Sequence, residues 1–244
     1  MEQREGTEMK KRWIPLLLIG LVVFLGGCAK AIPTKEAAAL FVDRLIYQKE
    51  TEKFEANFKD GAKLTETFEE QEQSFQENFT AGLLSTDSGL SQETANEISQ
   101  LVMNQVKEKT SYTIDVAETD NIRNVTYHVK GLDFVALMSQ TTQAITAQML
   151  KDTSLAKDEA KLAQALVTQL KTALADAPVK SEAVDVLLEM RPEKGKWTLV
   201  DGQQEQLQSL YLAFVAGVKD EKTLKADWAT AQEKLAEELA KELQ

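Results

Sequence analysis

Cys28 carries the most reactive side chain of this sequence, and it is the only cysteine among the 244 residues. A single cysteine cannot form a disulfide within its own chain, so its thiol is either free or modified. It stands at the end of a stretch that reads KKR, then WIPLLLIGLVVFL, then Gly26-Gly27-Cys28. A free thiol would be a liability on an exported protein, so the nature of this stretch decides what becomes of Cys28.

The stretch before Cys28 has the charge and hydropathy pattern of an export signal. Residues 10–12 are basic, and residues 13–25 carry no charge. As a helix, these uncharged residues would extend about 20 Å, well short of the roughly 30 Å hydrocarbon core of a bilayer. A cleaved signal peptide over residues 1–27 therefore fits better than a permanent span. Met9 is an alternative start to Met1, and both starts give the same mature protein.

Leu25-Gly26-Gly27-Cys28 resembles the lipobox of bacterial lipoproteins, in which an aliphatic residue and two small residues precede a cysteine. The resemblance implies that the Cys28 thiol receives diacylglycerol and that a signal peptidase cuts between Gly27 and Cys28. It also implies a mature protein that is lipid-anchored on the extracytoplasmic face of the cell membrane. Two acyl chains suffice for stable anchoring, at about 0.8 kcal/mol per buried methylene. The alternative is a plain secretory signal followed by a chance cysteine.

Other side chains that could do chemistry lack partners at a suitable spacing. His128 is the only histidine and falls on the polar face of a predicted strand, so we expect a surface residue rather than a metal ligand or a base. The acidic pairs at 69–70 and 237–238 are expected to be solvated helix faces. No calcium-loop, phosphate-loop or nucleophile-elbow pattern occurs. The sequence predicts no catalytic residue, no metal site and no cofactor.

The composition is that of an acidic, helix-rich protein. The full chain has a net charge of −11, and residues 1–27 contain four basic and three acidic side chains, so the remaining 217 residues carry −12. A surface of this sign argues against nucleic acid as a partner and against adhesion to anionic lipid through a basic patch. The expected membrane contact is therefore the lipid anchor, while any protein partner is unknown from sequence. A chain of this length can bury a sizeable core.

Helical periodicity dominates the chain after a short tether over residues 28–33. Apolar residues recur at spacings of three and four from Thr34, a candidate cap, through an opening helix that contains FVDRLIYQKETEKF. Further helices are expected over about 64–84, over about 132–150 and over 203–218. Two more are expected to begin at caps: one at Ser91, and one at Thr153 or Ser154 that runs to about 175. In the segment 64–84, the phenylalanines at 68, 75 and 79 can share one face, and core packing is a better interpretation of them than a ligand pocket.

Two segments alternate apolar and polar residues with period two, as half-buried strands do. The first turns at Asp120-Asn121, and the second turns within RPEKGK, where Pro192 and Gly195 suit a turn. The following residues are predicted to face the core: Tyr112, Ile114, Val116, Val125, Tyr127, Val129, Val184, Val186, Leu188, Met190, Trp197 and Leu199. The segment between these hairpins, from about 132 to 175, is predicted to be an inserted helical hairpin.

The chain is expected to end in a charged amphipathic helix over residues 219–244, separate from an α+β domain over residues 34–218. Its apolar residues step by three and four through Leu224, Trp228, Ala231, Leu235 and Leu239. This stripe spans little more than two heptads, which is too short for a secure coiled-coil assignment. Docking on the domain is the favoured interpretation, and self-association or contact with a partner are the alternatives.

These elements predict an α+β, helix-rich fold with an antiparallel sheet of about four strands in two hairpins and helices packed on one face. The order looks like that of cystatin-like or nuclear-transport-factor-like folds. GKWTLVDGQ, with Lys196-Trp197, and the opening helix are similar to small lipoproteins of unknown function in Gram-positive bacteria. That resemblance implies no established activity, and therefore no functional residues.

Three functions are compatible with the sequence. The leading hypothesis is a non-enzymatic binding or interaction module of unknown specificity, held at the membrane by the lipid anchor. The second is a carrier or sensor of a small apolar ligand, in which Phe41, Tyr112, Tyr127 and Trp197 line a pocket under the sheet instead of a filled core. The third is an envelope enzyme, which requires polar residues to gather in a cleft without a local motif.

Overall fold

A computed structural model describes residues 30–85 and 89–242. The predicted signal peptide, the Gly27–Cys28 cleavage position and the Cys28 lipidation site lie outside the described residues. The fold is α+β, as predicted. Its elements in chain order are α1 (Thr34–Leu45), α2 (Thr51–Asn57), α3 (Gly61–Ser85), α4 (Gln92–Lys109), β1 (Ser111–Thr119), β2 (Ile122–Lys130), α5 (Phe134–Lys151), the 3-10 turn η1 (Leu155–Lys157), α6 (Glu159–Ala175), β3 (Val184–Glu193), β4 (Lys196–Leu199), α7 (Gln204–Ala216) and α8 (Glu221–Glu242).

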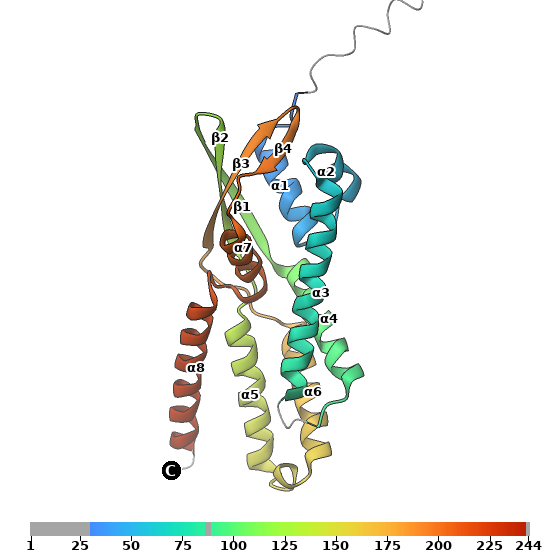
Figure 1. Ribbon diagram of the computed structural model, residues 1–244. Coiled ribbons are helices and arrows are strands. Elements are labelled where there is room, and N and C mark those ends of the chain that lie inside the picture. Colours follow the sequence, from blue (N-terminus) through green and yellow to red (C-terminus); the bar gives the residue numbers. More distant parts are fainter. Residues whose placement is uncertain (1–29, 86–88, 243–244) are drawn as a thin grey trace, which may run out of the picture.

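The four strands form one antiparallel sheet in the order β1-β2-β3-β4 (Figure 1). The two predicted hairpins are confirmed, and β2 pairs directly with β3, with His128 opposite Asp185. Pro192 lies in β3 opposite Trp197 rather than in the turn. A proline, which has no N–H, is tolerated here because it lies near the end of β3, beyond the residues that pair with β2.

Helices α1 and α7 cover one face of the sheet. The Tyr127 hydroxyl donates to the Ala38 carbonyl of α1 at 2.9 Å, and the ring centroids of Tyr112 and Phe214 are 5.9 Å apart. The opposite face carries Thr126, His128 and Leu187, the last with 46% of its surface exposed. The alternation of apolar and polar residues therefore places the core on one side of the sheet.

The helical hairpin between β2 and β3 closes on itself at its base. Leu132 and Val179 form an isolated antiparallel bridge, and the Asp133 N–H donates to the Pro178 carbonyl at 2.8 Å. Entry and exit of the insert therefore lie side by side, so β2 and β3 can pair as if they were consecutive. From this base, α5 and α6 extend away from the sheet, beside α3 and α4 (Figure 1).

Three predicted helix boundaries are wrong. Thr34 is the first residue of α1 and not its cap, since the N-cap position is Pro33 and no side chain caps the helix. The opening helix is interrupted between α1 and α2, where Gln48 and Glu50 both adopt left-handed backbone angles with φ of 54°. The helix α6 is capped by Asp158, whose carboxylate accepts the Lys161 N–H at 3.2 Å, and not by Thr153 or Ser154. Because Asp is as good a cap as Ser or Thr, residue type alone did not select the position. The Ser91 cap of α4 is confirmed, with a 3.2 Å bond from the Thr94 N–H.

The C-terminal helix α8 lies along α5 (Figure 1). The apolar stripe that begins at Leu224 and Trp228 is half-buried, and the Gln143 side chain of α5 donates to the Glu238 carboxylate at 2.8 Å. The structure therefore places α8 against the rest of the chain, which is the favoured interpretation of the sequence. Among the described helices, none is long and apolar enough to cross a bilayer.

Candidate functional site

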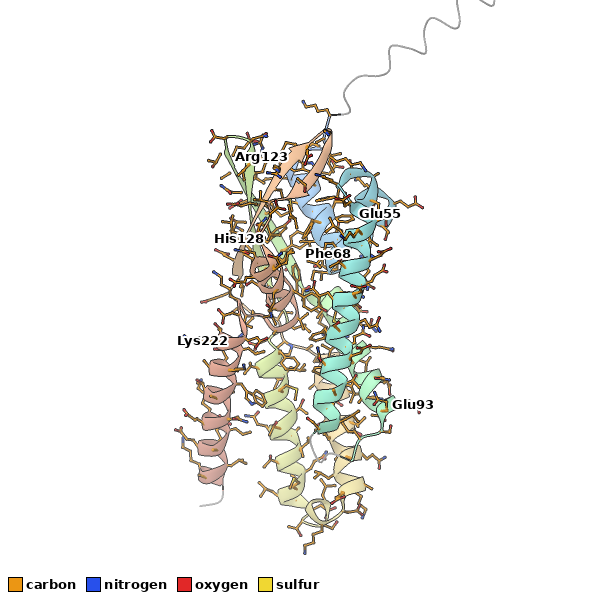
Figure 2. All side chains as sticks on the ribbon, in the orientation of Figure 1. Glu55, Phe68, Glu93, Arg123, His128 and Lys222 are labelled. Atoms are coloured by element: carbon orange, nitrogen blue, oxygen red, sulfur yellow. The ribbon has the colours of Figure 1, made fainter. Side chains whose placement is uncertain are left out.

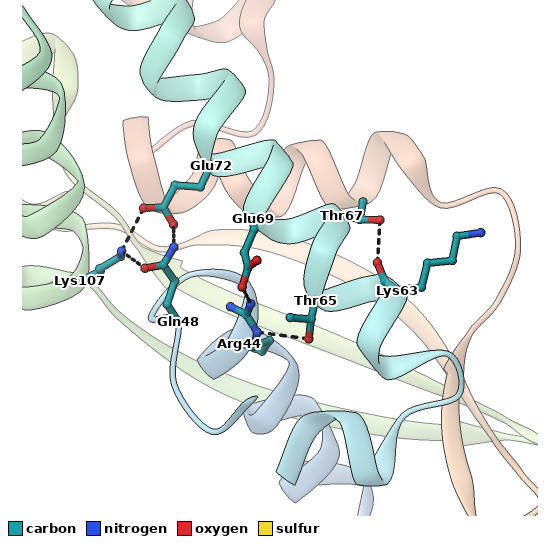
Figure 3. A network of polar contacts seen from close by, with 8 residues as sticks. All are labelled: Arg44, Gln48, Lys63, Thr65, Thr67, Glu69, Glu72 and Lys107. Atoms are coloured by element: carbon teal, nitrogen blue, oxygen red, sulfur yellow. Dashed lines mark hydrogen bonds and ion pairs between the residues drawn. The ribbon is translucent and has the colours of Figure 1, made fainter. Parts of the chain in front are cut away.

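Arg44 is the most deeply buried charged side chain of the described residues, with 2% of its surface exposed. It projects from α1 on the same side as the apolar core residues of that helix. Its guanidinium donates to the Thr65 hydroxyl at 3.4 Å and to the Glu69 carboxylate, both on α3 (Figure 3). A buried guanidinium needs such partners, because desolvating an unpaired charge is very costly. Arg44 therefore fixes α3 against α1.

A second polar cluster lies one turn further along α3 (Figure 3). The Lys107 ammonium of α4 donates to the Glu72 carboxylate at 3.0 Å and to the Gln48 side-chain oxygen at 2.7 Å, while the Gln48 amide donates to the other Glu72 oxygen. Gln48, whose backbone is in the left-handed region, thus links its own segment to α3 and to α4. Each charged group in this cluster has a partner of opposite charge, so the arrangement acts as a clamp that joins α3 and α4 to the connection between α1 and α2.

Replacing Glu72 by alanine is expected to destabilise the protein by about 2–3 kcal/mol, because it leaves Lys107 and Gln48 without their shared acceptor in a largely buried place. The Glu72 side chain is 8% exposed and that of Lys107 is 22% exposed, so the loss stays below that of a fully buried pair. The matched control is Lys171→Ala, whose partner Glu97 lies 2.7 Å away on the surface. An exposed pair contributes about 0–1 kcal/mol. Equal urea midpoints for the two variants would contradict a clamp role for Glu72.

The sequence did not single out this network. Glu69 and Glu70 are predicted as a solvated helix face, and Glu69 is indeed 60% exposed, yet it is also the ion-pair partner of Arg44. The available signal was Arg44 itself, a charged residue between Val42 and Leu45 on an otherwise apolar helix face. The partner could not be identified, because it lies 25 residues away on another helix.

The four residues predicted as pocket or core lie at the interface of helix and sheet. Phe41, Tyr127 and Trp197 have 3% or less of their surface exposed, and Tyr112 is half-buried. Phe41 packs edge-on against Phe68 at 5.3 Å between ring centroids. Burial raises the pKa of the Tyr112 and Tyr127 phenols, so both are neutral hydrogen-bond donors at physiological pH. Side chains from α1 and the sheet therefore pack against one another under the sheet.

The phenylalanine stripe of α3 is divided between neighbours, as the core-packing interpretation predicts. Phe68 contacts the rings of Phe41 and Phe54, whereas Phe75 lies 5.7 Å from the Tyr211 ring and Phe79 lies 5.9 Å from the Phe134 ring. These distances are typical of favourable aromatic pairs. The stripe therefore joins α3 to α1 at one end and to α7 and α5 further along.

Two of the grooves in the described part of the molecule lie between helices. One, of about 850 Å³, lies between the start of α4 and α6 and is lined by residues that include Thr94, Val167 and Lys171. The other, of about 440 Å³, lies between α3 and α4 and includes Gln76 and Ser99. Neither is lined by Phe41, Tyr112, Tyr127 or Trp197, and no cluster of three or more metal-ligating side chains is found in the described ranges.

His128 forms a polar cluster on the open face of the sheet, with one partner on each neighbouring strand. Its Nδ1 lies 2.6 Å from the Asp185 carboxylate on β3, and its Nε2 lies 3.2 Å from the Asp115 carboxylate on β1. The side chain is 29% exposed, in agreement with the predicted surface position. The two aspartates could not be predicted as partners of His128, because only the register of the strands brings the three side chains together. Hydrogen bonds to Asp185 and then Asp115 raise the pKa of His128 above its ordinary 6.5.

His128 should therefore stabilise the fold at acidic and neutral pH. A pKa raised on folding gives stability that is fully present below the unfolded value of about 6.5 and is lost as the pH rises through the folded value. Because this is the only histidine, a proton NMR titration of its ring gives one unobstructed curve. We expect a titration midpoint above 6.5 in the unmodified chain. The midpoint should fall further in Asp185→Asn than in Asp115→Asn, and it should not change in Asp158→Asn. An unshifted midpoint in the unmodified chain would contradict the contacts.

Comparison with known proteins identifies the family of this chain. Residues 28–215 match the family described as a domain of unknown function, DUF5105. A crystal structure of YcdA from Bacillus subtilis, described as a candidate lipoprotein, aligns with a TM-score of 0.49 and 20% identity over 74% of this chain, which spans 55% of that protein. None of the curated proteins matches. Since the matched region covers most of the chain, the protein belongs to the DUF5105 family.

Proposed function

We propose that the mature protein is a lipid-anchored, extracytoplasmic module that binds another macromolecule and has no catalytic activity. The observation that carries the anchor is the sequence Leu25-Gly26-Gly27-Cys28 behind a basic and then apolar leader. The family match supports the same boundary, because the matched region begins at Cys28. In this proposal, the Cys28 sulfur carries diacylglycerol after cleavage behind Gly27, and the acyl chains hold the protein at the cell membrane.

The polar clusters support the non-catalytic part of the proposal. Arg44 is paired with Glu69, and Glu72 with Lys107, each within a helix interface rather than at a cleft. His128 is held between Asp115 and Asp185 on the solvated face of the sheet. A general base needs a substrate-accessible position and a free acceptor, and these groups are engaged in contacts that join elements of the fold. The helix α1 across the sheet supports the cystatin-like likeness as part of the same proposal.

The anchor is tested by Cys28→Ala in a Gram-positive host that processes lipoproteins. The unmodified chain should take up a labelled fatty acid and fractionate with membranes, and its intact mass should exceed that of residues 28–244 by a diacylglyceryl group. Cys28→Ala should lose the label. It should either keep its apolar leader as an unlabelled, uncleaved precursor or, if the leader is removed by another route, leave the membrane fraction. A membrane-bound, labelled Cys28→Ala protein would overturn the proposed anchor.

The binding role is tested by crosslinking on intact cells. A reproducible crosslinked species of defined mass, absent from cells without the protein, is the expected result. Its failure to appear with amine-reactive and photoactivated reagents alike would count against an interaction module.

A further inference from the structure

We propose that the sheet end of the molecule is held against the phospholipid surface and that the far ends of α5, α6 and α8 point away from it. The inference rests on the proposed lipid anchor at Cys28. The sheet end is defined here as the start of α1, the β3–β4 turn and α2, which lie together at one end of the fold (Figure 1). The far end holds the α5–α6 connection and the last residues of α8 (Figure 1).

The length of chain between the anchor and the fold is the first argument. Ile32 is four residues after Cys28, and four residues span at most about 14 Å when fully extended. Ile32 is not free to move away from the fold, because its carbonyl accepts the indole N–H of the buried Trp197 at 2.9 Å. Helix α1 begins two residues later, at Thr34. The tether is therefore too short to let the domain turn over.

The dimensions of the fold supply the second argument. Helix α3 has 25 residues, and it runs from the sheet end towards the far end (Figure 1). At 1.5 Å per residue it is about 37 Å long, more than twice the reach of the tether. Figure 2 shows Glu55 of α2 near the sheet end and Glu93 of α4 towards the other end. A tether fixed at one end of such an elongated body keeps that end within about 14 Å of the lipid, whereas the far end has no such constraint.

The charges at the sheet end suit a phosphate-bearing surface. Lys35 and Lys194 are exposed and take part in no ion pair within the described residues. Their acidic neighbours Glu36 and Glu193 are already paired, with Lys53 at 2.9 Å and with Lys59 at 3.1 Å. Lys35 and Lys194 are thus available to lipid phosphates. Since α2 also carries acidic side chains and the chain is acidic overall, the tether sets the orientation and the lysines complement it.

Lysine acetylation on vesicles tests the orientation without changing the fold. The mature lipidated chain, its diacylglyceryl group verified by intact mass, is placed in vesicles of phosphatidylcholine with a minor share of phosphatidylglycerol. A membrane-impermeant acetylating reagent is applied, and modification is measured at each lysine by mass spectrometry. We expect Lys35 and Lys194 to react severalfold more slowly than Lys151 and Lys157, after each rate is divided by that of the same lysine in a chain without lipid.

A longer tether is the matched control. Twenty Gly and Ser residues inserted between Ala29 and Lys30 give a root-mean-square reach of about 25 Å, and they should remove the protection of Lys35 and Lys194. Uniform acetylation of the natural chain, or protection of Lys151 and Lys157 instead, would overturn the proposal. So would protection that persists with the long tether, because the short tether would then not be its cause.

The test remains informative if cells do not attach lipid to Cys28. In that case the intact mass lacks the diacylglyceryl group, which contradicts the proposed function. The chain that begins at Cys28 is then coupled through its only thiol to a maleimide lipid in the same vesicles. The same acetylation pattern is expected, and a uniform pattern again overturns the orientation.

Discussion

Replacing Gly131 by alanine is expected to destabilise the fold by about 3 kcal/mol, a large effect for one added methyl group. A Cβ at this position would lie 1.8 Å from the Ala213 carbonyl oxygen and 2.8 Å from that of Phe214. Both atoms belong to the backbone of α7, so no side-chain rotation can relieve the overlap. The helix would have to move as a body, although Leu210 and Phe214 fix it in the core.

Gly131 lies at the point where the sheet, the helical insert and α7 meet. Its carbonyl accepts the Lys180 N–H at 3.0 Å, and the next residue, Leu132, donates its N–H to the Phe214 carbonyl at 3.0 Å. A shift of α7 would strain these bonds together with the base of the insert. The variant should therefore have a lower urea midpoint in unfolding followed by circular dichroism. The slope of its unfolding free energy against urea concentration should be unchanged.

Gly82→Ala is the matched control for this prediction. Gly82 is exposed within α3, and a Cβ added there meets nothing within 4 Å. Alanine in a helix interior is more favourable than glycine by roughly 0.5–1 kcal/mol, so this variant should be slightly more stable than the natural protein. Similar stability of the Gly131 and Gly82 variants would mean that the close approach to α7 does not exist.

Replacing Trp197 by alanine is expected to cost about 3–5 kcal/mol, as is usual for a buried tryptophan. Its indole joins the segment before α1 to β4 through the 2.9 Å bond to the Ile32 carbonyl, and its own carbonyl accepts the Lys59 N–H at 2.8 Å. Phe58 forms an isolated bridge with it. The substitution would leave a cavity at the contact between α2, β4 and the N-terminal segment.

Two further variants separate the contributions of this side chain. Trp197→Phe keeps most of the buried ring and loses one hydrogen bond, which costs about 1 kcal/mol. Trp228→Ala removes the same residue type from α8, where it is only half-buried, and should cost about 1 kcal/mol. Chemical unfolding of the three variants should therefore show a much lower midpoint for Trp197→Ala alone. A comparable loss in Trp228→Ala would contradict the central place of Trp197.

Local chemistry explains why many elements could be predicted. The alternation through Tyr112, Ile114 and Val116 gave the right strand and the right buried face, because successive side chains of any strand point to opposite sides. Ser91 was a correct cap for a similar reason, since its hydroxyl bonds to an N–H only three residues away. Interactions between residues a few positions apart can be predicted from the types of those residues alone.

The errors arose where a distant contact overrode the local pattern. The opening helix was expected to continue, yet Gln48 takes a left-handed backbone conformation and its side chain binds Glu72 and Lys107, which are 24 and 59 residues away. A helix-period sequence cannot reveal this, because apolar spacing carries no information about the partner of a polar side chain. The same holds for the cap of α6, where several suitable residues compete.

The sequence by itself determined the basic and then apolar pattern before Cys28, the single thiol, the acidic charge and the type of nearly every element. These properties depend on composition and on residues within a few positions of one another. Only the tertiary structure decided that Arg44 pairs with Glu69, that His128 lies between two aspartates, and that Gly131 touches the backbone of α7. Each of these contacts joins segments whose proximity is created by chain topology, and no local periodicity encodes it.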